Sequence, residues 1–363
     1  MNRRLLSCRR SRMTMSRGLT FEFEDVVSQC DDAMVLTTAE VPTESVGRLA
    51  WRATRAAGLL VDRRAAHGGD ELVFAMAQSP TDLADHMAHR SLIRAAEVRA
   101  AYIEEMWMRN IPLQPDVRRF MHEFDHVFVG CEATVGLLAE HLDVPVSYLP
   151  PSVDTDRFAA DPWPPAAIDV YAMGRRQPDL HDALAAWADA DPSRFYLFDT
   201  FAGNPPVADH RQHRDKLADL IRRSRYFLVN EAKVDQPGET GRQSEVGYRF
   251  FEGAAAGAVM IGTATTAPAF DRLFDWDEPV IVVDDSGADL ADRIAELDAD
   301  PERRRGIRRR NAAGSLRAHD PAHRWRTVLA TLDVAETAGT DERIRRLAER
   351  ADEVDPDGEQ VAA

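Results

Sequence analysis

The sequence predicts an α/β protein made of two doubly wound domains, and three observations support this fold class. At 363 residues the chain is longer than one ordinary domain. Short apolar runs alternate with helical periodicity in both halves, as expected for parallel sheets covered by helices. Between the halves lies a proline-rich span without periodicity, which favours a linker. Its prolines are Pro150, Pro151, Pro162, Pro164 and Pro165.

Residues 1–18 contain six arginines and no acidic residue. No apolar run of signal-peptide or membrane-span length follows them, so we predict a disordered Arg-rich tail and no transmembrane segment. Six positive charges without an apolar anchor would give only weak contact with an anionic membrane surface.

The first domain is predicted over residues 19–150, because strand patterns alternate there with helical patterns. Strands are expected at 33–37, 71–77, 100–104, 125–130 and 145–149. Helices are expected at 43–58, 82–89, 115–123 and 132–141.

After a linker at 151–166, a second α/β domain is predicted over 167–334. An acidic tail at 335–363 follows, with a helical pattern in 341–352. Strands are expected at 168–173, 194–199, 226–230, 258–262 and 280–283. Helices are expected at 178–190, 207–224, 244–256, 288–298, 301–317 and 321–332.

The charge, cysteine content and histidine content of the chain indicate which partners and ligands it is expected to bind. The formal net charge of −16 argues against a nucleic-acid partner, because phosphate backbones are bound mainly by clustered Lys and Arg. Three cysteines without regular spacing indicate neither a disulfide scaffold nor a metal site, and a cytoplasmic location fits them best. The histidines do not form a recognisable ligand set, so we predict no metal.

Residues 241–262 carry most of the functional signal. With the apolar run before them they predict a strand, a polar loop, a helix rich in small residues and a second strand. In such a unit the loop and the first helical turn lie at the carboxyl edge of the sheet, where free N–H groups favour an anion. Lys233 and Arg242 in the preceding loop suit a phosphate.

Three motifs show a resemblance to a known family. The text SEVGYRFFEGAAAGAVMIG at 244–262 resembles the donor-site signature of GT-B glycosyltransferases of the group 1 type, and YLPPSVDTDRF at 148–158 resembles their linker. HDPAHRW at 319–325 is similar to the spore-maturation-like branch. The resemblance implies a GT-B fold, in which two Rossmann-like domains face a cleft.

The resemblance also implies an activity. A hexosyl- or glycosyltransferase of class EC 2.4 would move a sugar from a nucleotide diphosphate sugar, its co-substrate and not a cofactor, to an acceptor on the first domain. The family expectation is retention of anomeric configuration. Two alternatives stay open: a sugar-nucleotide epimerase of the same fold, and a non-catalytic binding protein.

Individual residues receive roles from this resemblance. Glu252 matches the glutamate that binds the ribose hydroxyls, and a carboxylate can accept both of their hydrogen bonds. Gly247 matches the glycine that lets the backbone approach the diphosphate, with Val246 and Tyr248 as flanking amide donors. A basic pair, Arg175 or Arg176 with Lys233 or Arg242, would stabilise the leaving phosphate without a metal.

One position departs from the family pattern. The first acid of the family's pair should fall at Ser244, whereas the glutamate is Glu245. Either a shifted helix start brings Glu245 to the transferred sugar, or Ser244 replaces the acid and binds a sugar hydroxyl or caps the helix.

A structural interpretation of the same residues also stays open. Glu245, Arg249 and Glu252 have the spacing of one helical face and could form a solvated ion-pair row. In the first domain, Glu104 and Glu105 end a predicted strand and could contact an acceptor hydroxyl or act as a base.

Overall fold

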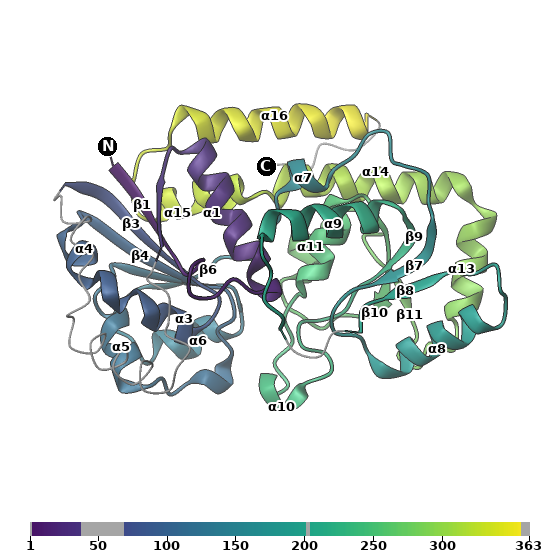
Figure 1. Ribbon diagram of the computed structural model, residues 1–363, viewed down its shortest axis with the longest axis horizontal. Coiled ribbons are helices and arrows are strands. Elements are labelled where there is room, and N and C mark those ends of the chain that lie inside the picture. The colour runs from purple at the N-terminus through teal and green to yellow at the C-terminus, as the bar shows by residue number, and fades with distance from the viewer. Residues whose placement is uncertain (1, 38–68, 201–203, 357–363) are drawn as a thin grey trace. The chain divides into compact units, whose positions relative to one another are not determined.

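The computed structural model describes residues 2–37, 69–200 and 204–356 (Figure 1). The helix predicted at 43–58 lies outside the described residues. The chain forms two compact units. Unit 1 comprises Met1–Pro151, Asn204–His210 and Arg324–Thr340, and unit 2 comprises Ser152–Gly203, Arg211–His323 and Asp341–Ala363.

Unit 1 is built on a parallel sheet in the order β2-β1-β3-β4-β5-β6. The five predicted strands are confirmed, and β1 is added to them. The strands are β1 (Asn2–Ser7), β2 (Met34–Thr37), β3 (Asp70–Ala77), β4 (Val98–Ile103), β5 (His126–Val129) and β6 (Val146–Tyr148). The helices are η1 (Met15–Arg17), α1 (Gly18–Cys30), α3 (Pro80–Asp85), η2 (His86–His89), α4 (Arg90–Ala95), η3 (Met108–Asn110), α5 (Pro115–Met121), α6 (Thr134–Ala139) and most of α15 (Pro321–Thr331).

Helices lie on both faces of this sheet (Figure 1). Buried apolar side chains pack between the sheet and the helices on each face. On one face, Phe23 of α1 and Trp325 of α15 pack against Phe74 of β3. The ring centroid of Phe74 lies 6.4 Å from that of Phe23 and 5.3 Å from that of Trp325. On the other face lie α3, α4, α5 and α6, whose buried residues include Leu83, Ile93, Phe120 and Leu138. This layering makes unit 1 a doubly wound domain.

The prediction of a disordered tail at 1–18 is wrong, because β1 is an interior strand of the sheet. Its arginines pair with acids that are distant in sequence. Arg3 binds Asp31 at 2.7 Å and Glu71 at 2.9 Å, and Arg4 binds Asp70 at 2.7 Å. The expected weak membrane contact loses its basis, since it assumed a free tail.

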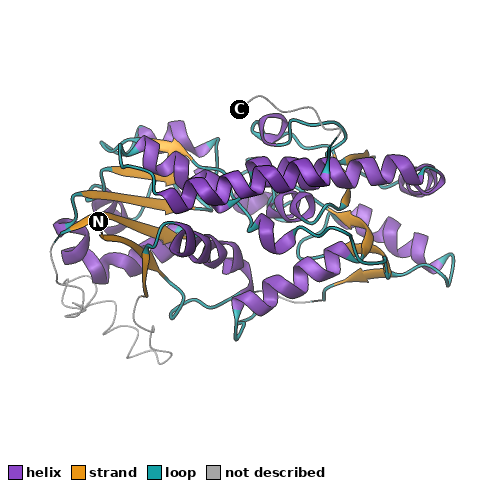
Figure 2. Ribbon diagram, turned by 90° about the horizontal axis from the view of Figure 1, so that it is seen from above, coloured by secondary structure: helices purple, strands orange, loops and turns teal. Residues whose placement is uncertain are grey.

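Unit 2 has a second parallel sheet, in the order β11-β10-β9-β7-β8, and its five predicted strands are confirmed. They are β7 (Ile168–Ala172), β8 (Tyr196–Phe198), β9 (Ser224–Leu228), β10 (Val259–Thr263) and β11 (Ile281–Val283). The helices are α7 (Thr155–Phe158), α8 (Pro178–Asp189), α9 (His210–Arg222), α10 (Pro237–Thr240), α11 (Tyr248–Ala255), α12 (Phe270–Leu273), α13 (Leu290–Ala299), α14 (Pro301–Ala318) and most of α16 (Ala338–Val354). Figure 2, coloured by secondary structure, shows the strands with helices on either side of them.

The C-terminal boundaries differ from the predicted ones. The domain predicted at 167–334 loses Arg324–Thr340 to unit 1, and the acidic tail at 335–363 contains the helix α16. The predicted linker at 151–166 contains α7. Asp156 of α7 binds Arg346 and Arg350 of α16 at 2.6 and 2.7 Å, so these arginines share one carboxylate. None of the described helices combines the length and the apolar character that crossing a membrane requires.

Candidate functional site

The candidate site lies at the carboxyl edge of the unit 2 sheet, between β7 and β9. After β7 the chain continues to β8 on one side, and β9 to β11 follow on the other side. Ligands of doubly wound sheets bind at such a reversal of strand order. Two loops meet at this point, because Asn230 Nδ2 in the loop after β9 donates to Arg175 O in the loop after β7, at 3.0 Å.

Helix α11 starts at Tyr248, not at residue 244 as predicted, and Gly247 is its N-cap. A Cβ on Gly247 would lie 2.2 Å from the carbonyl oxygen of Asn230. Only a glycine therefore lets α11 begin so close to the end of β9. The first-turn N–H groups lie beside the two loops, where an anion is favoured. Val246 is buried and Tyr248 half-buried at this start.

The late start of α11 changes two interpretations. Glu245 precedes the helix, so it does not form a helical row with Arg249 and Glu252, and Ser244 does not cap the helix. Glu245 is 4% exposed and accepts a hydrogen bond from Gln243 Nε2 at 2.7 Å. The Ser244 hydroxyl is buried and has no hydrogen-bond partner among the described residues. Both Glu245 and Ser244 remain candidates for contact with a sugar.

The predicted basic residues all occur at this edge, but most are paired with acids. Arg175 binds Asp235 at 3.1 Å, Arg176 binds Asp199 at 2.8 Å and Lys233 binds Glu239 at 3.4 Å. Arg242 is exposed, and no carboxylate of the described part of the chain lies within ion-pair distance of it. Each paired cation is locally neutralised.

Glu252 is fully buried in the middle of α11, and its carboxylate binds two arginines. One oxygen accepts from Arg249, one turn earlier, and the other accepts from Arg214 of α9. Burial opposes the ionisation of Glu252, but the charges of Arg249 and Arg214 outweigh it and hold the pKa of Glu252 below its ordinary value. The pattern of α11 did not point to Arg214, which lies in another helix.

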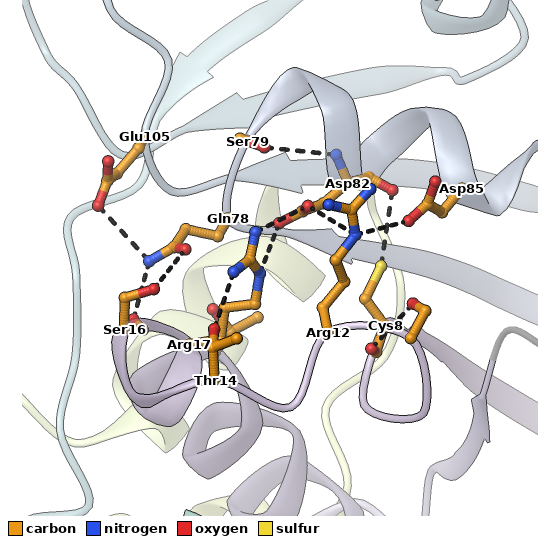
Figure 3. A network of polar contacts seen from close by, with 12 residues as sticks. Cys8, Arg12, Thr14, Ser16, Arg17, Gln78, Ser79, Asp82, Asp85 and Glu105 are labelled. Carbon is orange, nitrogen blue, oxygen red and sulfur yellow. Dashed lines mark hydrogen bonds and ion pairs between the residues drawn. The ribbon is translucent and has the colours of Figure 1, made fainter. Parts of the chain in front are cut away.

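The carboxyl edge of the unit 1 sheet has the same reversal of strand order, between β1 and β3. Figure 3 shows the loop after β1 held there by polar contacts. Gln78, after β3, donates to Ser16 O at 2.8 Å and reaches Glu105 at 3.5 Å. Arg17 binds Asp82 at 2.9 Å. Sequence analysis does not place the loop after β1 at this sheet edge, because it predicts that the arginines of this loop belong to a disordered tail.

Glu104, at the end of β4, is 4% exposed and accepts a short hydrogen bond from the Thr20 hydroxyl at 2.5 Å. Burial raises the pKa of Glu104 to about 8, against the effect of this hydrogen bond, and the charges of Glu105 and Glu24 add to the rise. Glu105 is half-buried beside Gln78. Of the two predicted acceptor-side acids, Glu105 is therefore the more accessible.

Replacing Glu104 by Gln should flatten the pH dependence of unfolding. Between its ordinary pKa and about 8, only the folded chain keeps the Glu104 proton. The unfolded chain then binds fewer protons, so the free energy of unfolding falls as pH rises, by up to about 1.4 kcal/mol per pH unit. Urea unfolding at pH 5 and pH 8 should show a smaller loss in Glu104→Gln than in the wild type. The exposed Glu140→Gln should behave like the wild type; an unchanged loss in Glu104→Gln would contradict the assignment.

Within residues 2–37, 69–200 and 204–356, no group of three or more His, Cys, Asp or Glu side chains is arranged to hold a metal ion. The cations described above are arginines and a lysine. The absence of a metal requirement stays a prediction.

Comparison with known proteins points to one fold. Residues 172–330, from the end of β7 to α15, match the family model described as "Glycosyl transferase-like". The structure of HepE from Anabaena with UDP and glucose aligns at a TM-score of 0.58 and 12% identity, over 92% of this chain and 100% of that chain. The fold is GT-B.

Another solved structure agrees with the GT-B assignment. An alpha-glucosyltransferase in complex with UDP-glucose and DNA aligns at a TM-score of 0.59 and 11% identity, over 92% of this chain and 99% of that chain. A search of curated proteins finds no match. At these identities the structural similarity establishes the GT-B fold, and most of the residues that match the family model lie in unit 2.

Proposed function

We propose that this chain is a glycosyltransferase that moves a sugar from a nucleotide diphosphate sugar to an acceptor. The observation that carries the proposal is the junction of β9 and α11. There, Gly247 brings the start of a helix against the backbone of Asn230, within the residues that match the glycosyl transferase-like family. That junction offers free N–H groups to a diphosphate.

The basic side chains at this edge support a metal-independent reaction. Negative charge grows on the leaving phosphate as the glycosidic bond breaks, and fixed cations can stabilise it. Arg175, Lys233 and Arg242 are the predicted cations. Retention of configuration is the expectation for the group 1 type, and the spore-maturation-like branch is proposed from the stretch HDPAHRW at 319–325.

The acceptor is assigned to unit 1, at the edge that carries Glu104 and Glu105. A net charge of −16 favours an acceptor other than DNA, although the alpha-glucosyltransferase of similar fold is seen with DNA. We place the activity in the cytoplasm on the basis of composition.

Calorimetric titration with UDP, GDP, dTDP and their sugar conjugates, with and without Mg²⁺, tests this function. We expect one diphosphate series to bind in the micromolar range whether or not Mg²⁺ is present. The selected donor, incubated alone, should be hydrolysed slowly at most, whereas conversion of its sugar without an acceptor would identify an epimerase. Folded protein that binds no nucleotide would overturn the proposal in favour of the non-catalytic alternative.

A further inference from the structure

An ion pair joins the two loops that meet at the carboxyl edge of the unit 2 sheet. Arg175, in the loop after β7, binds Asp235, in the loop after β9, with Nη1 at 3.1 Å from Oδ1 and 3.4 Å from Oδ2. The same loops are also joined by Asn230, whose Nδ2 donates to Arg175 O at 3.0 Å. Both loops are therefore fixed beside each other where the Asp235 carboxylate meets the Arg175 guanidinium.

Asp235 lies in a hydrogen-bonded turn. Gln236 N donates to Lys233 O at 2.8 Å, which closes a turn of four residues with Asp235 in the third position. The start of this turn is attached to the segment that precedes α11, because Ala232 N donates to Glu245 O at 3.0 Å. The backbone of the turn therefore presents the Asp235 carboxylate at the candidate donor site.

The neighbouring Arg176 is held in a different way. Its guanidinium binds the Asp199 carboxylate at 2.8 Å and donates to the backbone oxygens of Gly174 and Asp199, both at 3.0 Å. It also lies 5.2 Å from the centroid of the Phe198 ring. The Arg176 side chain is 18% exposed, whereas that of Arg175 is 43% exposed. Arg175 is therefore the arginine of this loop that a ligand can meet, and Arg176 has a structural role.

Within the described part of the chain, the guanidinium of Arg175 binds only Asp235, and the carboxylate of Asp235 binds only Arg175. An ion pair this accessible to water is weak. A diphosphate can bind Arg175 by displacing Asp235, or through the N–H groups that Asp235 does not use. In either case the two anions depend on one positive charge. Asp235 therefore opposes the binding of a phosphate to Arg175.

We propose that Asp235 weakens the binding of Arg175 to a phosphate of the donor, and so helps the product nucleoside diphosphate to leave. This inference rests on the proposed function and deepens it. The product carries more negative charge than the sugar nucleotide from which it forms, because its outer phosphate no longer bears a sugar. A cation at the site therefore attracts the product more strongly than the donor. A carboxylate paired with that cation reduces this difference.

Asp235→Asn is the first test, because it removes the charge and keeps the size of the side chain. Calorimetry measures the affinity for UDP and uridine, and stopped-flow displacement measures the dissociation rate of UDP. Both are made at low ionic strength, where ion pairs are least screened. UDP should bind about 2- to 5-fold more tightly, mainly through slower dissociation. Uridine has no phosphate, so its affinity should equal that for the wild type.

Two further variants show whether the gain depends on Arg175. Arg175→Gln should weaken UDP binding, and Asp235→Asn made in that background should add little, because the cation that Asp235 neutralises is gone. Asp285→Asn is the matched control. Asp285 is exposed in the loop after β11, at the same edge of the sheet, and forms no ion pair with a described residue. Its replacement removes the same charge, and UDP affinity should not change.

The outcomes separate the failure of this inference from the failure of the proposed function. If Asp235→Asn leaves UDP affinity unchanged or lowers it, the inference is overturned while the proposed function stands. The same holds if the gain is equally large in the Arg175→Gln background, in Asp285→Asn, or for uridine. If the wild type binds no nucleoside diphosphate at all, the proposed function fails and the inference fails with it.

Discussion

Replacing Asp31 by Ala should lower the free energy of unfolding by about 3–5 kcal/mol, because it leaves buried polar groups without their partner. Asp31 is 5% exposed. It accepts two hydrogen bonds from Arg3, at 2.7 and 2.8 Å, and one from Trp325 Nε1 at 2.8 Å. The carboxylate thus links β1, the end of α1 and α15. Urea unfolding, followed by Trp fluorescence, measures the loss.

Glu336→Ala is the control for this experiment. Glu336 is exposed, and it pairs with Arg326 at 2.8 Å in the same unit. Its removal should cost less than about 1 kcal/mol. If Asp31→Ala destabilised the protein no more than Glu336→Ala, the buried contacts of Asp31 with Arg3 and Trp325 would be contradicted.

Replacing Gly247 by Ala should weaken nucleoside diphosphate binding at least about 100-fold, or about 2.7 kcal/mol. The new Cβ would lie 2.2 Å from Asn230 O and 3.3 Å from Ala232 N, so the start of α11 has to move away from the end of β9. This displaces the helix N–H groups that the proposal assigns to the phosphates. Titration with the diphosphate selected above measures the effect.

Gly238→Ala is a matched control in the same loop, because no atom lies within 4 Å of the Cβ it would add. Its affinity should equal that of the wild type. Unchanged affinity in Gly247→Ala, with the helix content intact by circular dichroism, would show that the ligand does not use the start of α11.

Much of the fold could be predicted because its signals are local. Alternating strand and helix patterns gave the parallel strands of both sheets, apart from β1. That strand was missed because Arg3 and Arg4 flank only a short apolar run. Their partners Asp31, Glu71 and Asp70 are distant in sequence. From the sequence alone, a charged residue is predicted to be exposed to solvent, because its ion-pair partner in the fold is not known.

The position of the candidate site could also be predicted from the sequence, but some of its contacts could not. The loop and helix at 241–262 lie at the expected sheet edge, because the pattern of a strand followed by a glycine and a helix fixes that position. The helix start was wrong because the approach of Gly247 to Asn230 O depends on tertiary packing. Arg214 was missed for the same reason, since it reaches Glu252 from a helix 38 residues earlier.

Trp325 in the core of unit 1 has a consequence for protein synthesis. The last strand of this sheet ends at Tyr148, yet Trp325, which packs on Phe74 and has no exposed surface, is translated almost half a chain later. N-terminal domains usually fold as they leave the ribosome. Here the apolar face around Phe23 and Phe74 stays uncovered until α15 emerges. The nascent chain therefore exposes this apolar surface during almost half of its translation, and a fragment that ends at Pro151 would keep it exposed permanently.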